Sequence, residues 1–145
     1  MSFVVVLAIL SLDQITKIIA TRALIPSCPI AVIKGFLYFT LVHNRGAAFG
    51  ILKNQVPLFI LTSLIAIALT YVQMRKNRSF GLYQLSLSLI LAGAVGNLID
   101  RIFLGYVVDF IDFRIWPVFN VADSAITVGA ALLAWTILKP QRCTL

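Results

Sequence analysis

The sequence predicts an integral membrane protein of the all-α class, with four transmembrane helices in a single membrane domain of residues 1–145. Three observations predict this. Hydrophobic residues make up 61% of the chain, and the mean hydropathy is +1.01. Charged residues make up 12%, about half of the roughly 25% that soluble domains carry. Finally, four segments approach the length of about 20 apolar residues that crosses a bilayer.

The apolar segments are predicted to span the membrane at about residues 2–20, 56–72, 81–99 and 119–138. The second and third are uncharged throughout. The first contains Asp13 and Lys17, and it lacks both a basic start and a small-residue cleavage site. We therefore interpret it as a retained span rather than a signal peptide. The fourth carries Asp123 about one turn inside its start.

The short loop between the second and third spans predicts the orientation in the membrane. Its sequence MRKNRS holds Arg75, Lys76 and Arg78. Short loops rich in Lys and Arg stay in the cytoplasm, so this loop and both termini are expected there. Seven basic residues fall on the other side against five on this one. Those seven are spread over longer segments together with aspartates. The density of basic residues in the short loop therefore decides the predicted orientation.

The segment of about residues 32–52, between the first two spans, is predicted to form β-structure on the outer face. Its run GFLYFTLVH is rich in aromatic and β-branched residues, which favour strands. The following Asn-Arg-Gly suits a turn before a second short strand. Because a two-stranded hairpin is marginal alone, we expect it to lean on the helices or the lipid surface. A loop of residues 101–118 joins the third and fourth spans.

Charge and cysteine usage exclude several classes of function. The net charge is +7, but the basic residues lie between apolar spans, so membrane lipid headgroups rather than nucleic acid are the expected partner. Cys28 and Cys143 are predicted on opposite sides of the membrane and should not pair. The one histidine is His43, and no Cys or His cluster occurs. No metal site and no cofactor are therefore expected.

Four of the five acidic residues, all aspartates, fall in one 24-residue window: Asp100, Asp109, Asp112 and Asp123. Carboxylates beside a bilayer are costly and suggest a functional site. Two that come together can share one proton and activate water. Spacing leaves open whether Asp109 or Asp112 meets Asp123. For Asp112 the alternative is a solvated surface position, and for Asp100 a partnership with Arg101 or its surroundings at the helix end.

The remaining polar residues of the spans have structural alternatives. Asp13 and Lys17 share a helix face at i and i+4, which favours a structural ion pair over direct chemistry. Asn97 suits an interhelical hydrogen bond. Arg101 could equally well hold a peptide carbonyl or a carboxylate, or extend to the membrane interface.

In the fourth span, Asn120, Asp123 and Thr127 lie at i, i+3 and i+7 on one face. Since a charged side chain there cannot reasonably face lipid, Asp123 is predicted to face the bundle interior near a wet cavity. The helix dipole at the N-terminal end explains part of this placement.

Five motifs together resemble the bacterial lipoprotein signal peptidases, a family of membrane-embedded aspartyl peptidases. In chain order they are DQITK (13–17), VHNRGAAFG (42–50), GNLIDR (96–101), VVDFIDF (107–113) and FNVADSAI (119–126). Any one of them would be weak, but five in the family's order on a four-span chain are specific.

The resemblance implies removal of the signal peptide from diacylglyceryl-modified prolipoproteins in the bacterial cytoplasmic membrane, before the lipidated cysteine, without a cofactor and by a monomer. It assigns the catalytic pair to Asp109 and Asp123 rather than Asp112. The outer strand segment would be the family's β-cradle, and the loop before the fourth span its short periplasmic helix. Supporting roles facing the substrate fall to Asn44, Asn97, Arg101 and Asn120, and structural roles to Asp13, Lys17 and Asp100.

The main alternative is a small proton-coupled transporter or channel subunit, in which intramembrane Asp, Lys and Asn are also expected. It would place carboxylates near the bilayer midplane and show inverted repeats. In this chain the acids gather toward one face of the membrane, and no repeat is apparent.

Overall fold

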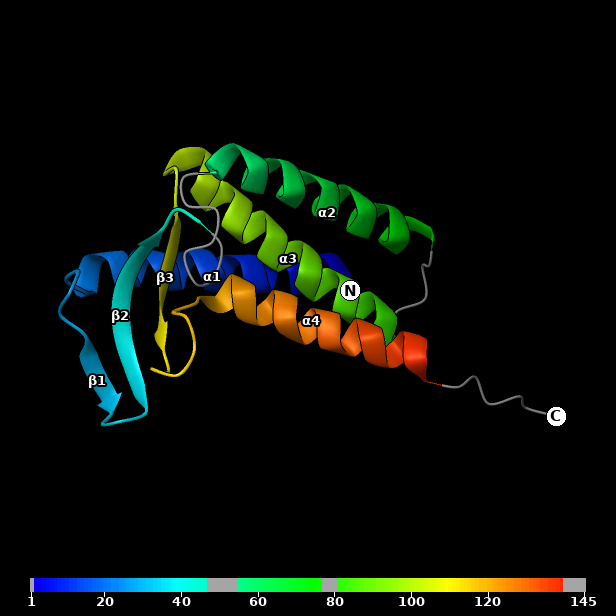
Figure 1. Ribbon diagram of the computed structural model, residues 1–145. Coiled ribbons are helices and arrows are strands. Elements are labelled where there is room, and N and C mark those ends of the chain that lie inside the picture. The colour runs from blue at the N-terminus through cyan, green and yellow to red at the C-terminus, as the bar shows by residue number, and fades with distance from the viewer. Residues whose placement is uncertain (1, 47–54, 77–80, 140–145) are drawn as a thin grey trace.

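The computed structural model describes residues 2–46, 55–76 and 81–139, and it contains four long helices and a three-stranded sheet (Figure 1). The helices are α1 (Ser2–Ala23), α2 (Val56–Lys76), α3 (Leu82–Phe103) and α4 (Val121–Leu138). Each is long and apolar enough to cross a membrane. The prediction of four spans is therefore confirmed, with α1, α2 and α3 each ending three or four residues later than expected.

Helix α3 is the centre of the bundle and packs against each of the other three helices. Its composition explains this position, because small residues let transmembrane backbones approach closely. A side chain at Gly93 would collide with the backbone carbonyl of Ala122 in α4, and one at Gly96 would meet the carboxylate of Asp13 in α1. These two glycines fix how closely α1 and α4 lie against α3.

The sheet consists of β1 (Ile30–Ile33), β2 (Leu37–Asn44) and β3 (Val107–Asp112), antiparallel in that order. The first two form a hairpin that begins two residues before the segment predicted to be β-structure and otherwise lies within it. The second strand expected after Asn-Arg-Gly would lie within residues 47–54, outside the described residues. The third strand comes instead from the loop between α3 and α4.

The short helix that the resemblance implied before the fourth span is not formed, which corrects that expectation. Residues 107–112 read VVDFID and form β3, pairing with β2 over most of its length. Paired β-branched and aromatic residues favour a strand, and β2 offers a free edge. After β3 the chain turns back, and Phe119 bridges to Ile111.

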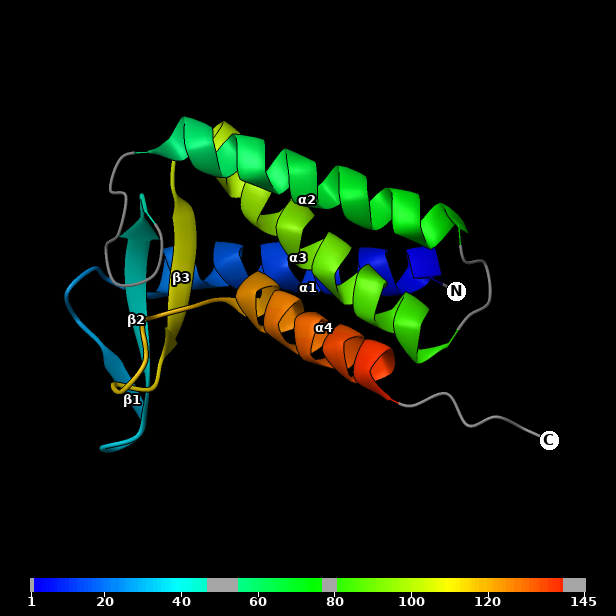
Figure 2. The ribbon, with the colours of Figure 1, turned by 45° about the vertical axis from the view of Figure 1, so that its right-hand side comes forward.

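The sheet lies at the end of the helix bundle where α1 and α3 end and α2 and α4 begin, and the last turns of α1 run beside it (Figures 1 and 2). The start of α1 and the end of α4 lie at the opposite end of the bundle (Figure 2). A small apolar cluster, formed by Ala20, Leu24, Leu41, Val108 and Phe110, joins the sheet to α1.

Candidate active site

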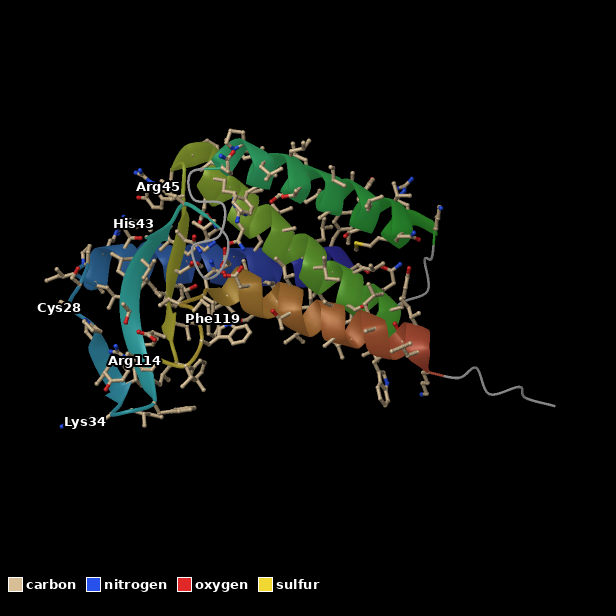
Figure 3. All side chains as sticks on the ribbon, viewed as in Figure 1. Cys28, Lys34, His43, Arg45, Arg114 and Phe119 are labelled. Carbon is tan, nitrogen blue, oxygen red and sulfur yellow. The ribbon has the colours of Figure 1, made fainter. Side chains whose placement is uncertain are left out.

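Asp109 and Asp123 line the same cavity, which has a volume of about 190 Å³. Asp109 comes from β3 and Asp123 from the first turn of α4. The chain returns from the strand to the helix because Phe119 exchanges backbone hydrogen bonds with Ile111. Phe119, labelled in Figure 3, stands at this return and lines the cavity as well. The local fold thus brings together two carboxylates that are 14 residues apart.

Asp109 is buried, with 1% of its surface exposed, and two amides bind its carboxylate. Asn44 donates to Oδ2 at 2.9 Å and Asn120 donates to Oδ1 at 2.8 Å. Asn44 reaches it because Val42 pairs with Asp109 and residues two apart on a strand share a face. Burial, and then the negative charge of Asp123, raises the pKa of Asp109 to about 7, against the opposing amides and Lys17.

Asp123 is half-buried and is held from its backbone and its side chain. Its backbone N–H donates to Oδ1 of Asn120 at 2.8 Å, which makes Asn120 the N-cap of α4. Its carboxylate oxygen Oδ1 accepts from Asn97 at 2.8 Å. The sequence placed Asn120 on the face of a helix. As the cap, it instead touches both aspartates of the cavity.

The amide of Asn97 has its orientation set by two donors. Its Oδ1 accepts from Lys17 at 3.0 Å and from Asn120 at 3.1 Å. Because both partners are donors, the oxygen of Asn97 has to face them, and its nitrogen has to face Asp123. The interhelical hydrogen bond expected of Asn97 is present and joins α3 to α1 and α4.

Lys17 forms a buried ion cluster with two aspartates. Its Nζ lies 2.9 Å from Oδ2 of Asp13 and 2.9 Å from Oδ2 of Asp100. The ion pair anticipated at i, i+4 is therefore present, and Asp100 joins it instead of pairing with Arg101. Asp100 also accepts from the backbone of Val108 at 3.1 Å, which ties α3 to β3.

Two further contacts extend this cluster. Asp13 accepts the backbone N–H of Ala122 at 2.8 Å and so holds the first turn of α4. Gln14 lies between the two carboxylates and donates to Asp13 at 3.1 Å and to Asp100 at 3.2 Å. Sequence reasoning passed over Gln14, and the sole signal for it was its place next to Asp13 inside an apolar span.

Arg101 lines the cavity, and its hydrogen-bond contacts with the described residues are long. Its Nη1 lies 3.5 Å from the hydroxyl of Ser63 and 3.5 Å from the carbonyl of Asn97, both at the limit of a hydrogen bond. The guanidinium also lies over the ring of Phe59, 5.3 Å from its centroid. A half-buried guanidinium with five N–H groups can donate to a further oxygen atom in the cavity.

Asp112 is not the solvated side chain that the sequence suggested. It is buried, accepting from the hydroxyl of Thr40 at 2.8 Å and from the backbone of Arg114 at 2.8 Å. The Nε of Arg114 lies 3.7 Å from its Oδ2. The sheet explains the difference, because Asp112 pairs with Tyr38 of β2 and so faces a covered surface. Its partners lie away from the cavity.

The partners of the five aspartates separate two of them from the rest. Asp13, Asp100 and Asp112 each lie within ion-pair distance of a cation. Among the described residues no such pair is found for Asp109 or Asp123, whose hydrogen-bond partners are amides and which share one cavity. In the described ranges no cluster of His, Cys, Asp and Glu is placed to hold a metal ion.

Several lining residues could not be found from the sequence. Trp116, Pro117 and Val118 border the cavity because the chain turns back after β3. A second cavity of about 340 Å³ shares Trp116, Phe119 and Asp123 with the first and continues along α4 past Thr127. The positions of these lining residues follow from the pairing of the strands, and no local sequence motif signals that pairing.

Comparison with known proteins gives concordant results. A sequence model described as "Signal peptidase (SPase) II" matches residues 5–139. A lipoprotein signal peptidase of Halothermothrix orenii is 49% identical over 98% of both chains. Another, of Caldanaerobacter subterraneus subsp. tengcongensis, is 50% identical over 95% of this chain and 96% of its own. A solved bacterial membrane enzyme superposes with a TM-score of 0.91 at 34% identity, covering 99% of this chain and 91% of the other.

Proposed function

The chain belongs to the signal peptidase II family of lipoprotein signal peptidases, and from this premise we propose that Asp109 and Asp123 are its catalytic pair. As a member of the family it is a multi-pass membrane protease that removes signal peptides from prolipoproteins. The comparisons do not support the alternative of a transporter or channel subunit. The further proposal concerns which residues act, and how.

The pair performs peptide hydrolysis with one shared proton. The carboxyl that holds the proton donates a hydrogen bond to the scissile carbonyl, and the ionised one accepts a proton from the attacking water. After the water oxygen has bonded to the carbonyl carbon, the proton passes to the leaving nitrogen and the C–N bond breaks. The products are a new carboxyl terminus on the signal peptide and a free amino group on the lipid-modified cysteine.

The amides around the pair support this chemistry. A carboxyl oxygen of Asp109 can accept from Asn44 or Asn120 and still carry a proton that points into the cavity. With a pKa of about 7, Asp109 exchanges its proton readily near neutral pH, where general acid–base groups act best. Because the two carboxylates titrate as a unit, the proton belongs to the pair rather than to either residue.

Arg101 and the second cavity suggest how the substrate lies. The guanidinium of Arg101 can hold a backbone carbonyl next to the scissile bond, while Asn44, Asn97 and Asn120 orient the aspartates. The second cavity is lined by Phe113, Trp116 and Phe119 and opens onto α4. Aromatic side chains there suit the apolar signal peptide and its diacylglyceryl group arriving from the lipid.

We place the site at the outer face of the bacterial cytoplasmic membrane, with both termini in the cytoplasm. The basic residues Arg75 and Lys76 end α2 at the far end of the bundle from the sheet, as the positive-inside rule requires. A monomer would suffice, because Asp109, Asp123 and their amide partners all come from one chain.

The observation that carries the proposal is that Asp109 and Asp123, alone among the aspartates of the described chain, share a cavity without a cation partner. The test is Asp109→Asn and Asp123→Asn, each assayed on a diacylglyceryl-modified prolipoprotein in detergent or vesicles. Each should lower the cleavage rate by at least about 10²- to 10⁴-fold, the usual contribution of general acid–base catalysis.

Asp112→Asn is the matched control. An asparagine there keeps an oxygen for the N–H of Arg114 and a nitrogen that can donate to the hydroxyl of Thr40. This variant should cleave at close to the normal rate. Normal cleavage by either Asp109→Asn or Asp123→Asn would show that the pair is assigned wrongly.

A further inference from the structure

Lys17 connects the buried ion cluster to the proposed catalytic pair. Its ammonium group has three hydrogens, and three acceptors surround it: Asp13, Asp100 and Oδ1 of Asn97. The first two contacts would satisfy a purely structural ion pair. The third, at 3.0 Å, leads directly to the amide that binds Asp123.

The geometry of this third contact has a directional consequence. If the amide of Asn97 turned over, its NH₂ group would face the ammonium of Lys17 and the amide nitrogen of Asn120, both donors. Its oxygen would then face the carboxylate of Asp123. Both contacts would be repulsive, so Lys17 locks the amide in the orientation that donates to Asp123.

We propose that Lys17 is a positioning residue for the reaction, which through Asn97 fixes the orientation of Asp123 and by its positive charge sets the pH range in which the pair holds one proton. The inference rests on the proposed function of Asp109 and Asp123. It goes beyond the structural role that the sequence assigned to Lys17.

Few charged groups face the pair from the surrounding elements. In the part of the chain that the structure describes, α1 contributes Lys17 and its ion-pair partner Asp13. Helix α3 contributes Arg101 and, behind Lys17, Asp100. The strand β2 contributes the uncharged Asn44. The charge of Lys17 opposes the rise in the pKa of Asp109. A change of charge in the ion cluster therefore changes the electrostatic field at Asp109 and Asp123, and few other charged groups contribute to that field.

The test measures kcat and KM against pH for two variants of opposite charge effect. Activity needs one proton on the pair, so it rises through the first deprotonation and falls through the second. Lys17→Met removes a positive charge, so the rising and the falling limb of the pH–rate profile should both move to higher pH by about one unit. The main loss should be in kcat, since Lys17 does not line the cavity.

Asp100→Asn removes a negative charge from beside Lys17 and should move both limbs to lower pH. It keeps an oxygen toward Lys17 and the N–H of Val108 and gives up the 3.2 Å bond from Gln14, whose amide still has Asp13 as an acceptor. The variant therefore tests the field with little change of shape. Asp112→Asn, whose partners lie outside the cluster, should leave the limbs in place. If Lys17→Met fails to fold, the direction of the Asp100→Asn shift decides alone.

An unchanged pH profile in both variants, with activity lowered equally at every pH, would overturn the inference and leave Lys17 a structural residue. That result would leave the catalytic pair untouched, provided that Asp109→Asn and Asp123→Asn are inactive. Normal cleavage by either of those two variants would instead refute the proposed function itself.

Discussion

Replacing Gly96 by alanine sets two physical effects of opposite sign against each other. Gly96 lies in the interior of α3, where alanine is favoured over glycine by about 1 kcal/mol. The same substitution introduces a Cβ 2.6 Å from Oδ2 of Asp13, where ordinary contacts begin at 3.4 Å. The carboxylate would have to retreat by about 0.8 Å.

The retreat weakens contacts that hold three helices together. Asp13 is fully buried and binds Lys17 at 2.9 Å and the backbone of Ala122 at 2.8 Å. Displacement by this amount stretches at least one of these contacts past hydrogen-bond length. Losing a hydrogen bond to a charged group costs about 1.5–3 kcal/mol, which exceeds the gain in helix propensity. We expect Gly96→Ala to lower the free energy of unfolding by about 0.5–2 kcal/mol.

Reversible unfolding in detergent, followed by far-ultraviolet circular dichroism, measures this difference. Gly81→Ser is the control, because Gly81 caps the same helix and has nothing within 4 Å of where its Cβ would lie. Serine is a favourable N-cap, so the control should be neutral or slightly stabilising. A Gly96→Ala protein more stable than the original would refute the close approach of α1 and α3 at this point.

Two further predictions concern the sheet. The pKa of Asp109 is about 7 in the folded protein against 3.8 for an ordinary aspartate, so stability present below about pH 4 should be lost as the pH rises to about 7. Asp109→Asn should flatten the dependence of Tm on pH in that window, and an unaltered slope would argue against a buried, proton-binding Asp109. Thr40→Val removes a donor 2.8 Å from Asp112 and should cost about 1–3 kcal/mol while leaving cleavage intact, as unfolding and activity assays would show.

The four helices could be predicted from the sequence because the thickness of the bilayer requires about 20 apolar residues in each transmembrane helix. The third strand could not, because VVDFID becomes a strand through pairing with β2, which is remote in the sequence. Asp112 was misjudged for the same reason, since its burial comes from the paired strand rather than from its neighbours in the chain.

Part of the candidate site could likewise be predicted from the sequence, and part could not. Charge scarcity alone identified Asp123, and helical spacing alone paired Asp13 with Lys17. The choice of Asp109 over Asp112 depended on resemblance to a known family, because both lie in one strand and the pairing of that strand with β2 decides what each side chain meets. That Asn120 is a helix cap bonded to both aspartates depends on where α4 begins, and helix boundaries are the weakest part of sequence-based prediction.

The first turn of α4 is held by polar contacts from two directions, Asn120 at its cap and Asp13 at the N–H of Ala122. Lys17 and Asp100 fix α1 to α3 at the same depth. At this end the three helices are therefore registered along the membrane normal by short, buried polar bonds, whereas at the other end Ser2 of α1 reaches Gln84 of α3 over a longer 3.4 Å. When the bilayer is thinner or thicker than the helices are long, tilt and local lipid deformation absorb the mismatch. The more weakly tied end, where α1 begins and α4 ends, takes up more of that adjustment, so the geometry of the proposed catalytic pair is insulated from membrane thickness.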